Sequence, residues 1–229
     1  MTRIAQFCMV AIQTIWISAC CHTNNFSDHP LSGQKLLFSY SVKPDAASVR
    51  LHISNPTPGH NVITDIVVGA GTEILSSEAQ EKLNRAVRPE GIAAAVSTGI
   101  EKVLTTHLRF QGVSADQDPE CVVETLVEEC NIESGSTGIE LSIKARTEMI
   151  HRATGDIIWR DCLEEKVMIK HTPAGAIPLP GIGTAASIYN AAEFFRLSEK
   201  EIQEILLQAA EETGRKLGES IRNDYSKSH

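Results

Sequence analysis

The fold of this chain is most clearly indicated by residues 139–150, which read Ile-Glu-Leu-Ser-Ile-Lys-Ala-Arg-Thr-Glu-Met-Ile. Apolar or small side chains alternate here with polar ones, and this two-residue period predicts a β-strand with one buried and one solvated face. The side chains expected on the buried face are Leu141, Ile143, Ala145, Thr147 and Met149. Those expected on the solvated face are Glu140, Ser142, Lys144, Arg146 and Glu148. Their alternating charges favour cross-strand ion pairs over an acid–base pair.

Two further strands are predicted on either side of this one, at residues 121–133 and 157–169. Turn residues at 134–138 and 153–156 separate the three segments, which indicates antiparallel pairing. The alternation breaks midway through 121–133, and we therefore expect a β-bulge there. Earlier in the chain, apolar patterning predicts strands within residues 36–42, 48–54 and 61–68.

Helices are predicted at residues 76–85, 89–110, 184–195 and 198–223. Pro89 suits a first helical position and Gly112 a C-cap, while Ser198 and Glu201 have the spacing of a capping box. We predict an α+β fold in which an antiparallel sheet has helices packed on one face, all in a single domain at residues 36–229. Trp159 should be buried there, close to Leu141, Ile143 and residues 202–206.

The amino terminus has the pattern of a secretory signal peptide. Arg3 is followed by an apolar run at residues 4–19, shorter than the about 20 residues of a membrane-spanning helix. Ile17-Ser18-Ala19-Cys20 resembles the lipobox of bacterial lipoproteins, which implies cleavage of residues 1–19 and acylation of Cys20, with palmitate among the acyl chains. Residues 20–35 are then expected to be the lipidated Cys and a flexible tether. An Asp directly after the lipidated Cys resembles the inner-membrane retention signal of enterobacterial lipoproteins, and this chain has Cys21 there instead. We therefore expect the outer membrane, facing the periplasm, rather than the inner membrane.

Charge and cysteine content limit the classes of partner. Removing Arg3 with the signal takes the net charge from −8 to −9, which argues against nucleic acid and against electrostatic docking on anionic lipid. Membrane contact is therefore expected through the anchor. Cys121 and Cys130 are predicted in one strand, too far apart to bridge each other. The pairing among Cys21, Cys121, Cys130 and Cys162 stays open at this stage.

The sequence contains none of the common catalytic or metal-binding motifs that we sought. There is no His-Glu-x-x-His, no Cys-x-x-Cys and no Gly-x-Ser-x-Gly. Gly69 and Gly71 lack the third glycine of a dinucleotide loop. We therefore expect no catalytic residues, no cofactor and no metal site.

A resemblance to a known group rests on Thr154-Gly155-Asp156-Ile157-Ile158-Trp159, on the order of elements around it and on the closing helix. Residues 89–223 resemble small periplasmic lipoprotein domains, a group that includes the TolB amino-terminal domain, the curli-secretion lipoprotein and the lipoprotein activators of peptidoglycan synthases. The resemblance implies a bacterial envelope lipoprotein that binds proteins and is not an enzyme. An accessory subunit of a lipid or small-molecule transport system and an enzyme with an unrecognised site are the alternatives.

The loop at residues 173–182 is the candidate partner-contact site. Its apolar side chains Ile177, Leu179 and Ile182 follow neither a helical nor a strand period, because prolines and glycines interrupt them. Apolar groups gathered on a loop favour a binding surface. The alternative is that they plug the core at the edge of the sheet.

Overall fold

The alternating segment of residues 139–150 forms β6 (Gly138–His151), a central strand of the sheet. The computed structural model describes residues 22–29, 31, 33–46, 49–53, 72–171 and 183–228. Its other strands are β1 (Thr23–Asn24), β2 (Lys35–Val42), β3 (Arg50–Ile53), β4 (Gln111–Gly112), β5 (Cys121–Gly135) and β7 (Ile157–His171). Its α-helices are α2 (Thr72–Ala86), α3 (Pro89–His107), α4 (Gly183–Phe195) and α5 (Glu199–Ser228). Short 3-10 turns are η1 (Phe26–Asp28), η2 (Pro44–Ala46) and η4 (Ala115–Gln117).

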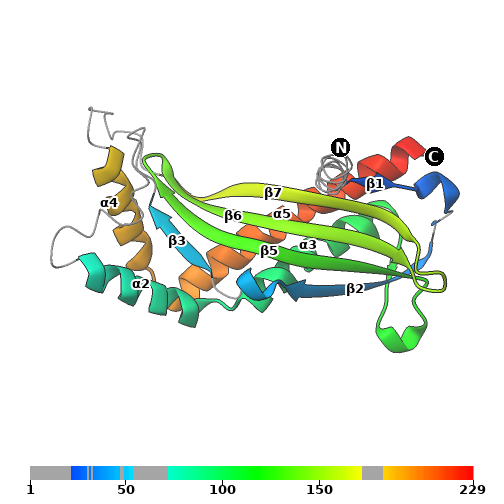
Figure 1. The fold of residues 1–229 in the computed structure, drawn as a ribbon, viewed down its shortest axis with the longest axis horizontal. Coiled ribbons are helices and arrows are strands. Elements are labelled where there is room, and N and C mark those ends of the chain that lie inside the picture. Colours follow the sequence, from blue (N-terminus) through cyan, green and yellow to red (C-terminus); the bar gives the residue numbers. More distant parts are fainter. Residues whose placement is uncertain are drawn as a thin grey trace, which may run out of the picture.

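The strands form one sheet in the order β1-β7-β6-β5-β2-β4, with β3 also paired to β5 (Figure 1). The β5–β6 and β6–β7 pairs are antiparallel, as the turn signals predicted, and the unpredicted β1–β7 pair is antiparallel too. The β2–β5, β3–β5 and β2–β4 pairs are parallel. The predicted α+β class is thus confirmed, but the sheet is mixed. The chain between β3 and β5 contains α2 and α3, and such a long crossover permits parallel pairing.

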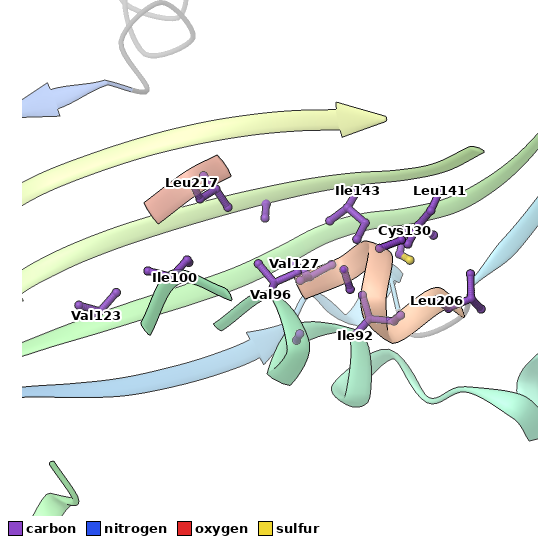
Figure 2. Packing of buried hydrophobic residues seen from close by; sticks show 14 of the residues in the cluster. Ile92, Val96, Ile100, Val123, Val127, Cys130, Leu141, Ile143, Leu206 and Leu217 are labelled. Atoms are coloured by element: carbon purple, nitrogen blue, oxygen red, sulfur yellow. The ribbon is translucent and has the colours of Figure 1, made fainter. Parts of the chain in front are cut away.

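Helices α3 and α5 pack against each other and against the same face of the sheet (Figure 1). The predicted buried face of β6 meets them: Leu141, Ile143 and Met149 are fully buried. Figure 2 shows Ile92, Val96 and Ile100 of α3 beside Val123 and Val127 of β5, with Leu206 and Leu217 contributed by α5. The bulge expected in β5 lies between Val127 and Glu129.

The two helices approach unusually closely because glycines line their crossing. A Cβ atom on Gly99 would lie 2.1 Å from the carbonyl oxygen of Glu211, and one on Gly214 would lie 1.9 Å from that of Val96. Real side chains cannot occupy such space without moving the backbone. The glycines therefore set the separation of α3 and α5.

The helix starts predicted from Pro89 and from the capping box are confirmed. Helix α2 begins at Thr72 rather than 76, α5 ends at Ser228 rather than 223, and the predicted end of α3 is wrong. Pro89 begins α3, and Ser198 and Glu201 cap each other's backbone N–H groups ahead of α5. Helix α3 ends at His107 rather than near Gly112, because Arg109 takes a left-handed conformation with φ 58°.

Trp159 is fully buried, as predicted. The prediction that it lies close to Leu141 and Ile143 is wrong. It pairs with Met149, whereas Leu141 pairs with Val167, eight residues further along β7. At about 3.3 Å per residue this separation is roughly 26 Å. The indole Nε1 instead donates to Asp224 near the carboxyl end of α5, at 3.1 Å.

The described part of the predicted tether is structured. Thr23 and Asn24 form β1, and Phe26 and Leu31 are fully buried. The Phe26 ring packs edge-on against Tyr225 of α5, with ring centroids 5.4 Å apart. Burial of the Phe26 side chain therefore holds this mostly polar segment against the domain. The strand predicted at 61–68 and the Gly69–Gly71 segment lie outside the described residues.

Candidate functional site

The residues singled out from the sequence as sites fall outside the part of the chain that the structure describes. These are the lipidation residue Cys20 and the loop residues Ile177, Leu179 and Ile182. Their assignments remain predictions. The described residues instead draw attention to β7, its neighbour α5 and the short strand β1.

Strand β7 lies at one side of the sheet, and β1 covers only one of its ends (Figure 1). In the β1–β7 pair, Thr23 lies opposite Arg160 and Asn24 opposite Trp159. Within the described ranges, no strand pairs with the outer side of residues 163–171 of β7. An edge of this kind presents a row of backbone N–H and C=O groups that another strand can bind.

The phase of these edge groups follows from one backbone hydrogen bond. Asn25 N–H donates to the carbonyl oxygen of Ile158 at 2.8 Å, so the groups of residue 158 point away from β6. Ile158 lies at a register shift between β6 and β7, but β1 pairs Asn24 with Trp159 and Thr23 with Arg160 without a break, so the groups of Arg160 point outward as well. Directions alternate along a strand, and from Arg160 to Met168 the β6–β7 register is continuous. The N–H and C=O groups of Glu164 and Lys166 therefore point outward at the edge.

An open pocket of about 1310 Å³ adjoins this edge, lined by residues of α3, α5 and β7. We call its part between β7 and α5 the β7 groove, defined by Val167, Ile169, Ile205, Ala209 and Glu212. The Val167, Ile169 and Ile205 side chains are only half-buried. The β7 groove thus offers apolar surface beside outward-pointing backbone groups.

Polar contacts hold the other end of β7 against α5. Glu165 and Asp161 both contact side chains of α5 and therefore lie on the helix-facing side of β7. Lys216 forms an ion pair with Glu165, and the Ser220 hydroxyl lies 3.3 Å from the Asp161 carboxylate. Lys216 and Ser220 are four residues apart and so lie on one face of α5, and this spacing was the only sequence signal for these contacts. It is informative only once α5 is known to lie over β7.

The solvated face of the sheet carries the ion pairs expected from the sequence. Arg160 Nε and Arg146 Nε lie 3.0 and 3.5 Å from the same Glu148 oxygen. Lys144 lies within 4 Å of both Glu128 and Glu129. Every one of these carboxylates faces a cation, which is the arrangement of a structural charge network. In the described residues, no three His, Cys, Asp or Glu side chains gather as a metal site would require.

The cysteines fall into two kinds. Cys121 and Cys130 of β5 are buried free thiols, and burial raises the pKa of Cys121 to about 11 and that of Cys130 to about 12. Thiols with such pKa values hold little thiolate at neutral pH and react slowly. Cys162 of β7, in contrast, is disulfide-bonded, and its partner lies outside the described residues.

No helix in the described ranges has the length and apolar character that crossing a bilayer requires.

No protein-family model and no curated protein matches this chain. Among solved structures, a Xanthomonas campestris protein of the family DUF330 is 14% identical and covers 86% of this chain and 90% of its own, with a TM-score of 0.38. A predicted lipoprotein of Caulobacter crescentus is 11% identical, with coverages of 59% and 83% and a TM-score of 0.34. The LpoB C-terminal domain of Salmonella enterica is 13% identical, with coverages of 62% and 87% and a TM-score of 0.24. At these values the likenesses concern the general fold and carry no argument about function.

Proposed function

We propose that this chain is a lipid-anchored lipoprotein of the cell envelope that binds a protein partner and has no catalytic activity. The anchor is the acylated Cys20, and the membrane is the outer membrane, on its periplasmic side. The partner contributes an extended segment that adds as a strand to the edge of β7. The outward N–H and C=O groups of Glu164 and Lys166, next to the β7 groove, are the observation that carries this binding mode.

Strand addition suits the chemistry of this edge. Backbone hydrogen bonds supply affinity, and alternate side chains of the added strand reach a neighbouring pocket that supplies selectivity. The β7 groove lies where such side chains would fall, and Val167 and Ile205 give it apolar walls. Among the described strands, β4 pairs with β2 only at Lys35 and Leu36, which leaves part of that edge unpaired as well, but β7 is favoured because the pocket adjoins it.

Charges on the edge limit which segments can pair. Glu164 and Lys166 are exposed, and Lys166 Nζ lies 2.7 Å from Glu133 on β5. Charged edge residues are a common protection against unselective pairing. We therefore expect an extended partner segment that places an opposite charge beside Glu164 and apolar side chains over the β7 groove.

The partner can be identified by site-specific photo-crosslinking in cells. A photoreactive residue at position 164 should capture one protein, whereas the same residue at Glu124, exposed on the solvated face of β5, should not. Equal capture at both positions would argue against a binding edge at β7. The captured protein, once purified, then serves in the quantitative experiment below.

Glu164→Pro is expected to weaken binding of the captured partner by about tenfold or more, because an edge hydrogen bond is lost and the ring obstructs pairing. The proline removes an N–H that points away from β6, so the melting temperature should change little. Glu164→Ala is the matched control, since it removes the same charge and keeps the N–H. Titration of both variants with the purified partner is the measurement, and equal affinities would reject strand addition at this position.

Cys20→Ser is expected to abolish membrane anchoring, because the hydroxyl cannot form the thioether that carries the acyl chains. Each buried CH₂ group contributes about 0.8 kcal/mol, so losing several chains removes nearly all of the membrane affinity. Fractionation and intact-mass measurement should find the variant released or left as an uncut precursor. Membrane retention at an unchanged mass would show that Cys20 is not the anchor.

A further inference from the structure

We propose that the strand bound at the edge of β7 is β7 of a second copy of this chain, paired antiparallel across a two-fold axis at Glu165. This pairing rests on the strand addition proposed above and names the partner that supplies the strand. The order of side chains around Glu165 carries it: an apolar residue and an acid precede, and a base and an apolar residue follow, in Leu163-Glu164-Glu165-Lys166-Val167. A strand with this order is complementary to its own reversed copy.

The axis at Glu165 brings opposite charges together. In an antiparallel pair centred there, Glu164 of each copy lies opposite Lys166 of the other. Both residues have outward N–H and C=O groups, so they form hydrogen-bonded pairs with Cα atoms about 5.5 Å apart. Lys166 reaches Glu133 at 2.7 Å, which places its side chain and, by alternation, that of Glu164 on the solvated face. Unlike charges directly opposite each other stabilise such a pair.

Neighbouring registers lack this agreement. An axis at Glu164 places that carboxylate opposite itself, and an axis at Lys166 does the same for two ammonium groups. Like charges in these positions destabilise strand pairing. An axis between two residues sets outward N–H and C=O groups against inward ones, so no ladder forms. Charge and backbone direction together therefore select the axis at Glu165.

The same axis brings apolar side chains together beside the β7 groove. Leu163 of one copy lies opposite Val167 of the other, and both side chains are half-buried against the core on the helix-facing side of the sheet. Val167 is also a wall of the β7 groove. Pairing covers the exposed parts of these side chains in both copies, and burial of apolar area favours association.

Glu165 itself lies on the axis, opposite Glu165 of the other copy. Two isolated carboxylates in this position would repel each other. Each Glu165 is already ion-paired with Lys216 of its own α5, so cations and anions are balanced at the centre of the dimer. The ion pairs thereby offset the repulsion between the two carboxylates.

Strand β1 and an irregularity of β7 limit the length of the pairing. β1 occupies the outer side of β7 at Trp159 and Arg160, positions that lie opposite 171 and 170 of the other copy. β7 shifts register against β6 between Met168 and residue 170, and such a shift bends a strand. Each β7 can therefore turn away from its partner there, and the shared ladder spans residues 163–167.

The photo-crosslinking experiment at position 164 separates this dimer from strand addition in general. We expect the crosslinked product from cells that make the full-length protein to contain two copies of this chain, identified by mass spectrometry. Capture of a single different protein would overturn the dimer and leave strand addition at β7 in place. Capture no stronger than at Glu124 would overturn both.

Charge exchange tests the register. Two tagged full-length copies are made in the same cells, one with a photoreactive residue at Met168, and the yield of crosslinked dimer is measured. Glu164→Lys in both copies, or Lys166→Glu in both, should lower this yield by about tenfold or more, because like charges then face each other. Glu164→Lys in one copy with Lys166→Glu in the other should restore it, since each base again faces an acid.

Glu124→Lys in both copies is the matched control. It makes the same charge change on the solvated face, two strands away from the edge, and should leave the yield unchanged. The exchanged residues are exposed, so melting temperatures should also stay close to that of the natural protein. Unchanged yields in the single exchanges, or no recovery in the mixed pair, would overturn the axis at Glu165.

Discussion

Gly214→Ala is expected to lower the free energy of unfolding by about 3 kcal/mol or more, the largest effect we predict for a single methyl group. The added Cβ would lie 1.9 Å from the carbonyl oxygen of Val96 and 2.7 Å from its carbonyl carbon. These are backbone atoms of α3, so no side-chain rotation relieves the clash. The two helices must separate, and the contacts that both make with the sheet are then disturbed. Denaturant unfolding followed by circular dichroism measures the loss.

Gly91→Ala is the matched control for this prediction. Gly91 also lies in α3, but the nearest atom to an added Cβ is a methyl carbon of Leu207 at 3.7 Å, an ordinary contact. Alanine is favoured over glycine within helices by up to about 1 kcal/mol, so this variant should be as stable as the natural protein or slightly more stable. If Gly214→Ala unfolds like Gly91→Ala, the close crossing of α3 and α5 is wrong.

Trp159→Ala is expected to cost about 3–5 kcal/mol of unfolding free energy, the range for removing a large aromatic side chain from a core. Trp159 is fully buried at the β1 end of β7, and its indole N–H donates to Asp224. The substitution therefore opens a cavity and removes the link between β7 and the last turns of α5. Equilibrium unfolding in denaturant gives the value, and a loss below about 1 kcal/mol would place the side chain at the surface.

Trp159→Phe separates the two contributions. It keeps an aromatic ring in the core and removes only the N–H donor, so the expected cost is about 1 kcal/mol for the hydrogen bond plus a smaller packing term. Asp224 retains Lys227 at 3.3 Å and His22 at 3.5 Å, and its charge is therefore not left isolated. A cost equal to that of Trp159→Ala would mean that the hydrogen bond, rather than the ring, determines stability here.

The sequence by itself determined the local conformations and the exposed and buried faces of most elements. The alternation at residues 139–150 predicted β6 and its charged face, and Pro89 with the Ser198–Glu201 capping box predicted where α3 and α5 begin. These features depend on neighbours only a few residues away, because side-chain period, φ restriction and capping are local properties. The candidate binding edge was missed, since an edge exists only once the order of strands is known.

The tertiary structure alone decided how distant segments pair. Nothing near Leu36 or Arg50 indicates that β2 and β3 run parallel to β5, and nothing near Thr23 indicates that a polar stretch becomes β1. Gly99 and Gly214 are more than a hundred positions apart, and each is ordinary until the other's helix crosses it. The physical reason is that pairing and close packing depend on which surfaces meet after the chain has closed, and surfaces that meet can be remote in sequence.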